Sequence, residues 1–195
     1  WLQDFHGLKD ANTGYISCGY VARGKKSYPA IKQNISKNKY SSLSGTFSVR
    51  RDVFDQVGGY DPLLIQSTNW EFTARAIECC EKQNLSIKYT NNVNFEYTLH
   101  SDTGKISMRD RKRAEATLYM HNKYKDSGVL HFRRNGFLNS SAINYVRVGE
   151  IKKGREVFRK LLREDFSLKN VANVIAFEIP FVRNKLWGRK FPNKK

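Results

Sequence analysis

Cysteine, proline and long apolar runs are scarce in this sequence, and each scarcity narrows the class of protein. The 195 residues include three cysteines, four prolines and thirteen glycines. Cys18 and the adjacent pair Cys79-Cys80 give neither an even disulfide framework nor the paired spacing of a zinc site, so we expect buried thiols in a reducing cytoplasm. The low proline and glycine content is unlike that of a low-complexity chain. No run of about 18 apolar residues occurs, so the sequence predicts no membrane-spanning helix.

Charge is plentiful and unevenly distributed. Apolar residues make up 39% of the chain, which is enough for a core of ordinary size, and the formal net charge is +17. Residues 1–100 carry 12 Lys and Arg against 9 Asp and Glu, a net of +3, whereas residues 101–195 carry 23 against 9, a net of +14. The basic half favours phosphate-rich partners. Charge alone does not choose among nucleic acid, anionic lipid headgroups and a pyrophosphate-linked substrate.

The pattern of residues 1–107 alternates between helix and strand. Turn residues separate these elements, notably Gly58-Gly59 and Asp61-Pro62, and Asn69 is a good N-cap for the longest helix. We expect helices ending near residue 9, over 51–57 and over 69–84, and strands over 14–21, from 44 onward, over 86–90 and over 92–99. This order predicts an α/β fold, with residues 1–107 forming one domain.

The pattern of residues 108–195 is helical throughout. A basic helix is expected over 108–125, and a helical hairpin over 142–148 and 155–162 turns at Gly149. The segment from Ser167 to Trp187 is apolar and aromatic up to Pro180 and then basic. The sequence therefore predicts a basic helical extension after the α/β domain.

Three motifs in the first half resemble those of one enzyme family. The string Ser-Gly-Thr-Phe-Ser-Val-Arg-Arg-Asp-Val-Phe-Asp-Gln-Val-Gly-Gly-Tyr-Asp begins at Ser44, Asn69-Trp70-Glu71-Phe72 follows with Arg75, and Tyr97-Thr98-Leu99-His100 comes last with Ser107. In order and spacing they resemble the donor-sugar and acceptor loops, the acidic helix start and the late Tyr-x-x-His segment of family 2 glycosyltransferases. The resemblance covers residues 44–107 and implies the carboxyl-terminal half of a GT-A domain, with a partial Rossmann-like sheet.

This resemblance implies an enzyme that moves a sugar from a nucleotide-diphosphate donor to an acceptor hydroxyl, with inversion at the anomeric carbon. The acceptor would be a glycan or a lipid-linked molecule, as in cell-envelope polysaccharide synthesis. A carboxylate must take the acceptor proton, and Mn²⁺ or Mg²⁺ must offset charge on the departing diphosphate. By resemblance, Gly45 and Thr46 contact the donor sugar, Asp61 and Trp70 contact the acceptor, and His100 approaches the diphosphate or the metal.

The sequence departs from the family at two catalytic positions. The family's base is an Asp where this chain has Asn69, whose amide cannot accept a proton at neutral pH. Glu71 is the substitute base, although on a helix it points about 200° away from position 69. No Asp-x-Asp metal motif occurs. We expect that motif in a nucleotide-binding half upstream of Trp1, and we expect no transferase activity from the 195 residues alone.

Each candidate residue also has an ordinary structural explanation. Gly45 and Thr46 suit a strand start, Asp61 a turn, Trp70 a core position and Asn69 a helix N-cap. The alternative function is a glycosyltransferase-like binding module without activity, whose basic helices contact RNA or a protein partner. No aromatic ribonucleoprotein string, Gly-x-x-Gly loop or Cys/His finger occurs, so we expect no specific nucleic acid partner.

The end of the sequence indicates a second kind of contact. The apolar stretch Val171–Val182 is too short to span a bilayer but suits an interfacial segment, and Trp187 and basic residues up to Lys195 follow it. We therefore expect a cytoplasmic protein that binds an anionic membrane surface peripherally, at the inner face of the cell membrane. The alternative is a core helix built on Val174, Ile175, Phe177 and Phe181, followed by a solvated tail.

Overall fold

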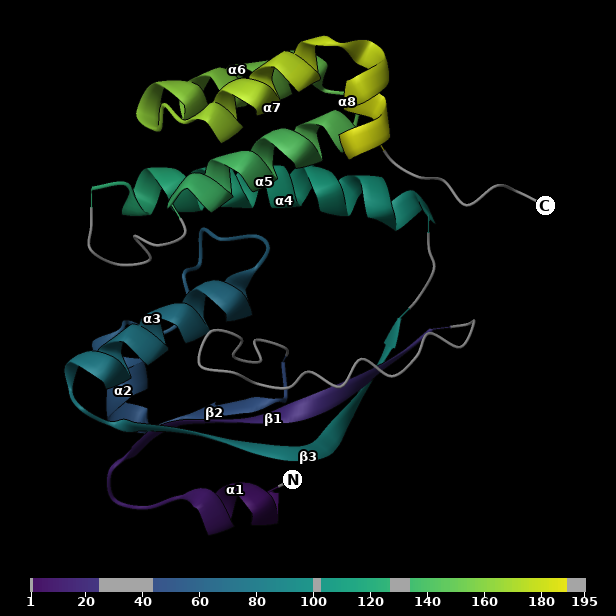
Figure 1. Cartoon of the computed structure of the whole chain (residues 1–195). Coiled ribbons are helices and arrows are strands. Elements are labelled where there is room, and N and C mark those ends of the chain that lie inside the picture. The colour runs from purple at the N-terminus through teal and green to yellow at the C-terminus, as the bar shows by residue number, and fades with distance from the viewer. Residues whose placement is uncertain (1, 25–43, 100–102, 127–133, 189–195) are drawn as a thin grey trace. The chain divides into compact units, whose positions relative to one another are not determined.

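The computed structural model describes residues 2–24, 44–99, 103–126 and 134–188, and it divides the chain into two compact units. The first unit comprises residues up to 102 apart from 64–66, and the second comprises the remainder. Figure 1 shows a small mixed sheet with helices in the first unit and helices throughout the second. The predicted α/β fold class with a helical carboxyl-terminal region is confirmed, and the helical region begins at Thr103.

The sheet of the first unit has three strands in the order β2-β1-β3. β1 (Thr13–Gly24) is antiparallel to β2 (Phe47–Val49) and parallel to β3 (Ser86–Leu99). The two strands predicted over 86–90 and 92–99 are one continuous strand, whose register shifts opposite Cys18–Tyr20. Asparagine is depleted in strands, and three asparagines between positions 91 and 94 explain why the sequence pattern breaks there.

Two helices lie in the crossover from β1 to β3, and a third precedes the sheet. α1 (Leu2–Leu8) comes before β1, and α2 (Arg51–Gln56) and α3 (Thr68–Lys82) come after β2. α3 buries the predicted face of Phe72, Ala76, Ile77 and Cys80. Its carboxyl end lies near the start of β1, because Cys80 and Leu85 approach Gly14 closely. Its amino end therefore points toward the carboxyl ends of the parallel strands.

α3 begins earlier than the sequence indicated. Ser67 precedes the helix in the left-handed conformation, with φ 65° and ψ 20°, and its side chain makes no capping bond. The carbonyl of Ser67 accepts the N–H of Glu71 at 2.9 Å, which extends the helical bonding back to this point. Asn69 thus lies inside the first turn, and its prediction as the N-cap was wrong.

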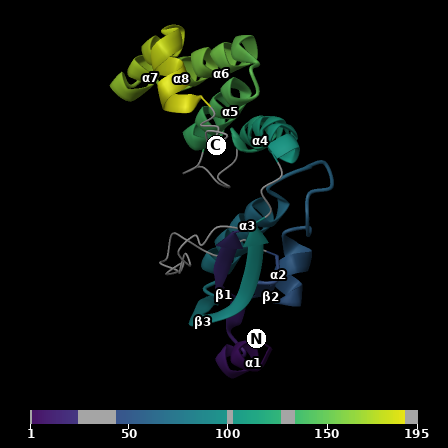
Figure 2. The same cartoon turned by 90° about the vertical axis from the view of Figure 1, so that its right-hand side faces the viewer.

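The described part of the second unit contains five helices. They are α4 (Thr103–Tyr124), α5 (Arg134–Arg147), α6 (Ile151–Glu164), α7 (Leu168–Glu178) and α8 (Pro180–Trp187). Each packs on the next (Figures 1 and 2), and Gly149, with φ 82°, turns the chain between α5 and α6 as predicted. Their core includes Leu138, Ala142, Val157, Phe158, Leu161 and Phe177. None of the described helices is long and apolar enough to cross a membrane.

Candidate functional site

The starts of β2 and α3 lie next to each other in the first unit. The carbonyl of Thr46 accepts the N–H of Cys18 at 2.9 Å, which fixes the entrance of β2 against β1. Phe47 then packs on Phe72, with ring centroids 6.3 Å apart. Because Phe72 belongs to the beginning of α3, this contact brings the first motif segment to the second.

Arg75 holds the turn before Asp61 against α3. Its guanidinium donates to the carbonyl of Val57 and, at 2.8 Å, to that of Gly59. The same group makes a bidentate ion pair with Glu71, at 2.8 Å from Nε to Oε1 and 2.7 Å from Nη2 to Oε2. The side chains of Arg75 and Glu71 are only 12% and 1% exposed. Such a charge-assisted fork fixes the turn to the helix.

An aromatic cluster adds to this connection. The ring of Tyr60 lies 4.5 Å from that of Phe72, and the ring of Phe54 lies 5.4 Å from it, centroid to centroid. Phe54 and Tyr60 also meet edge to face at 6.4 Å. The three residues come from α2, the following turn and α3, so the turn that carries Asp61 is held on two sides.

Gly45 and Thr46 form the tight entrance to β2. Gly45 has φ 85°, and a Cβ at this position would lie 2.8 Å from Cε2 of Phe95. Glycine is therefore required for its backbone conformation and for the close approach of the ring. Gly45 is exposed, whereas the side chain of Thr46 is fully buried. Of the two predicted donor contacts, only Gly45 reaches the surface.

The acceptor-side candidates lie in the turn and at the start of α3. The carboxylate of Asp61 accepts the N–H of Leu63 at 2.9 Å, as a turn aspartate does. Asn69 and Trp70 are half-buried in the first turn of α3. The structure thus gathers Gly45, Asp61, Asn69 and Trp70 on elements that contact one another.

His100 lies outside the described residues. The strand before it ends at Leu99, which pairs with Gly24, six residues beyond Cys18. Six residues of strand extend about 20 Å. In Figure 1 the paired ends of β1 and β3 run on beyond β2 and α3. The described end of β3 is therefore not adjacent to the entrance of β2.

Glu71, the predicted substitute base, is enclosed. It is buried, and Arg75 binds both of its carboxylate oxygens. In this conformation no hydroxyl of a bound acceptor contacts it, and its clear task is to orient Arg75. Sequence reasoning missed this pairing, although a Glu followed by an Arg four residues later on a helix is a recognisable signal.

The described residues contain no metal centre. No group of three or more His, Cys, Asp or Glu among them could hold an ion. The Mn²⁺ or Mg²⁺ implied by the resemblance therefore has no donor set in this part of the chain. The cysteines are free thiols, with Cys18 and Cys80 buried as predicted and Cys79 half-buried.

Comparison with known proteins gives no relative. No protein-family model, curated protein or solved structure matches the chain.

Proposed function

We propose that residues 44–107 are the acceptor side of an inverting nucleotide-sugar glycosyltransferase of family 2 and the GT-A fold. The observation that carries this proposal is the contact between motif segments that are distant in sequence. The entrance of β2, the turn at 57–61 and the start of α3 are joined by Phe47, Phe72 and Arg75. Open α/β sheets bind ligands where loops and helix starts meet at strand ends.

Each residue has a chemical task in this proposal. Gly45, which is exposed at the entrance of β2, offers its backbone groups to the donor sugar. Asp61 accepts a hydrogen bond from an acceptor hydroxyl, and the indole of Trp70 stacks on a sugar face. Asn69 orients the acceptor hydroxyl without taking its proton, which passes to solvent water or to a base outside the described residues as the oxygen attacks the sugar and the diphosphate departs. The acceptor is a glycan or a lipid-linked sugar, as in the synthesis of cell-envelope polysaccharides.

The diphosphate side lies outside the described residues in this proposal. The nucleotide and its Mn²⁺ or Mg²⁺ bind a nucleotide-binding half that the described residues do not supply, with His100 near the diphosphate. We therefore expect no turnover of nucleotide sugars by the purified 195 residues in the presence of Mn²⁺ or Mg²⁺. Turnover would contradict the assignment of the donor side to another half.

A binding module without activity is the second candidate. Two observations favour it: Asn69 stands where the family has its base, and the Glu71 carboxylate is enclosed by Arg75. Arg109, Lys112 and Arg113 are exposed on α4 and offer positive charge to RNA or to an acidic protein.

Binding of the purified chain to an oligosaccharide array and to RNA separates the two candidates. In the transferase proposal, the chain binds oligosaccharides, and Trp70→Ala and Asp61→Asn each weaken binding about tenfold, the loss of a stacking or hydrogen-bond contact. Leu63→Ala is the control, since Leu63 is an exposed apolar neighbour on the same loop. RNA binding without glycan binding, unaffected by Trp70→Ala, would favour the binding module.

A further inference from the structure

The outer side of α7 is apolar although its inner side already packs in the helical core. Phe177 is buried against Phe158, and Val174 is half-buried beside them. On the other side, Leu168, Ala172 and Ile175 follow at spacings of four and three residues, and at 100° per residue they fall within about 60° of one another. Ile179 comes directly after the helix, in an extended conformation. All four are exposed, Leu168 by 88% and Ile175 by 58%.

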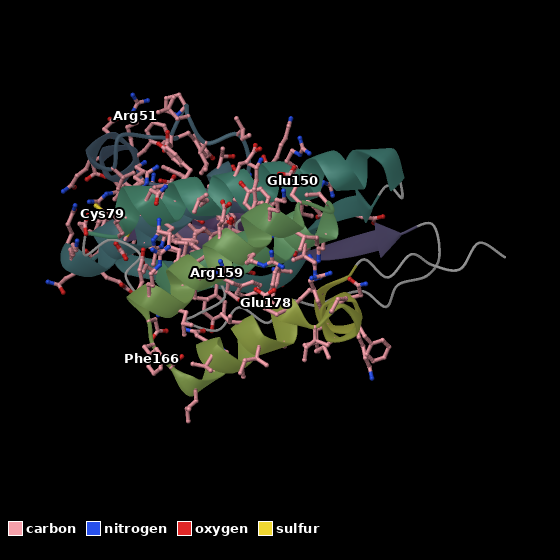
Figure 3. The ribbon with its side chains drawn as sticks, turned by 90° about the horizontal axis from the view of Figure 1, so that it is seen from above. Arg51, Cys79, Glu150, Arg159, Phe166 and Glu178 are labelled. Atoms are coloured by element: carbon pink, nitrogen blue, oxygen red, sulfur yellow. The ribbon has the colours of Figure 1, made fainter. Side chains whose placement is uncertain are left out.

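Two exposed phenylalanines lie just before and just after α7 in the sequence. Phe166, which Figure 3 labels, lies between α6 and α7 and is 81% exposed. Phe181 lies at the start of α8 and is 74% exposed. We call the six residues Phe166, Leu168, Ala172, Ile175, Ile179 and Phe181 the apolar face. Large apolar side chains that are exposed together along one helix and at its two ends mark a contact with a protein or a membrane.

The surroundings of the apolar face are basic. Residues 151–188, which contain α6, α7 and α8, include nine Lys and Arg against four Asp and Glu, a net charge of +5. Arg155 on α6 donates to the Glu178 carboxylate at 2.9 Å, and Arg159 lies 3.8 Å from it, as the labels in Figure 3 help to locate. The Glu178 carboxylate is thus paired within the unit, and the helices that carry the apolar face have a positive net charge.

We propose that the apolar face docks on an anionic membrane surface, with α7 lying in the plane of the interface. Apolar side chains then enter the boundary between headgroups and acyl chains, while Lys169 and Lys185 remain near lipid phosphates. The sequence left two alternatives for this segment, a core helix and a membrane-binding segment, and in this proposal each applies to different residues. Phe177 and Val174 pack in the core, whereas Ile175 and Phe181 are exposed and would contact the membrane.

The alternative partner for the apolar face is a second copy of the chain, and the positive charge of this region disfavours it. A stripe with this spacing also suits a helix partner, but two copies of this face would bring positive charge against positive charge. An anionic bilayer has the opposite sign and attracts each nearby Lys or Arg. The proposal does not depend on glycosyl transfer, because it uses no residue of the first unit.

Vesicle co-sedimentation of the full chain tests the apolar part of the proposal. Vesicles of phosphatidylcholine with about one third phosphatidylglycerol should bind the chain at least about tenfold more strongly than phosphatidylcholine alone, and salt should weaken this binding. Ile175→Ser should lower the partition coefficient about tenfold by removing an apolar contact. Leu63→Ser, which removes an exposed leucine from the first unit, is the matched control and should leave binding unchanged.

The electrostatic part of the proposal is tested by two double variants that remove the same charge from different places. Lys169→Gln with Lys185→Gln should weaken anionic binding about 25-fold at low salt, since each charge contributes about fivefold. Lys9→Gln with Lys82→Gln removes the same charge from exposed positions of the first unit and should change binding less than about twofold. Equal binding to neutral and anionic vesicles, or no binding, would overturn the proposal. A dimer that Ile175→Ser dissociates in sedimentation velocity would assign the face to a second copy instead.

Discussion

At the residue scale, the ion pair between Glu71 and Arg75 determines the geometry of the candidate site. Glu71→Gln should lower the unfolding free energy reported by α3 by about 3 kcal/mol, because it leaves a buried guanidinium beside a neutral partner. Native-state hydrogen exchange of the α3 amides measures this energy for the unit itself. Arg51→Gln breaks an exposed pair with Asp55 at the same i,i+4 spacing and should cost less than about 0.5 kcal/mol. Similar losses in both variants would show that the pair does not hold the turn.

Alanine substitutions at Gly45 and Gly58 distinguish the cost of a strained backbone conformation from the cost of a steric clash. Both have positive φ, 85° and 74°, but nothing lies within 4 Å of a Cβ built at Gly58, whereas Phe95 lies 2.8 Å from one at Gly45. Gly58→Ala should therefore cost about 1 kcal/mol for conformation alone, and Gly45→Ala about 1 kcal/mol more. Urea denaturation measures both. Adding Phe95→Leu should recover the excess at Gly45, and equal costs for the two alanines would refute the contact.

At the scale of elements, Cys80 packs α3 closely against β1 at Gly14. Its Sγ lies 2.6 Å from where a Cβ would stand on Gly14, and its side chain is fully buried. Burial, assisted by the charge of Cys79, raises the pKa of the Cys80 thiol from its ordinary value of 9.0 to about 11. Above pH 9 the unfolded chain loses this proton and the folded chain keeps it. Stability from this group is therefore present below pH 9 and lost as the pH rises to about 11.

Cys80→Ala tests this alkaline dependence. The unfolding free energy of the original chain should fall by about 2 kcal/mol more than that of the variant between pH 9 and pH 11. Urea denaturation at pH 8, 9, 10 and 11 gives both curves. The variant should be less stable at pH 8, where it lacks the packed sulfur, and the difference should shrink at high pH. Parallel curves would mean that the thiol ionises equally in both states.

The elements themselves were predictable where one pattern dominates. The buried face of α3, with Phe72 and Ile77, follows from helical spacing, and Gly149 follows from its place between two helical patterns. The start of α3 did not, because Ser67 adopts a left-handed conformation that glycine or asparagine more often adopts. For the candidate site, sequence identified Asp61 and Trp70 as candidates, but the bonds from Arg75 to Val57 and Gly59 are tertiary and have no local signature.

At the scale of the whole molecule, each unit has its own hydrophobic core. Phe72 is 1% exposed among Phe47, Phe54 and Tyr60 in the first unit. Phe158 is equally buried in the second, with Phe177 and Trp187 both 5.2 Å away between ring centroids. A separate core is what defines a domain that can unfold on its own. Replacing either phenylalanine with alanine therefore removes an equally buried ring from one core and leaves the other core intact.

Phe72→Ala and Phe158→Ala should each destabilise one unit and spare the other. Loss of a buried phenylalanine ring costs about 3–5 kcal/mol through lost burial and the cavity left behind. Native-state hydrogen exchange should show that loss in α3 for Phe72→Ala and in α5 and α6 for Phe158→Ala, with the remaining amides unchanged within about 0.5 kcal/mol. If either substitution lowered protection equally in α3, α5 and α6, the chain would unfold as one cooperative domain, because a defect in one core would then be felt by every element.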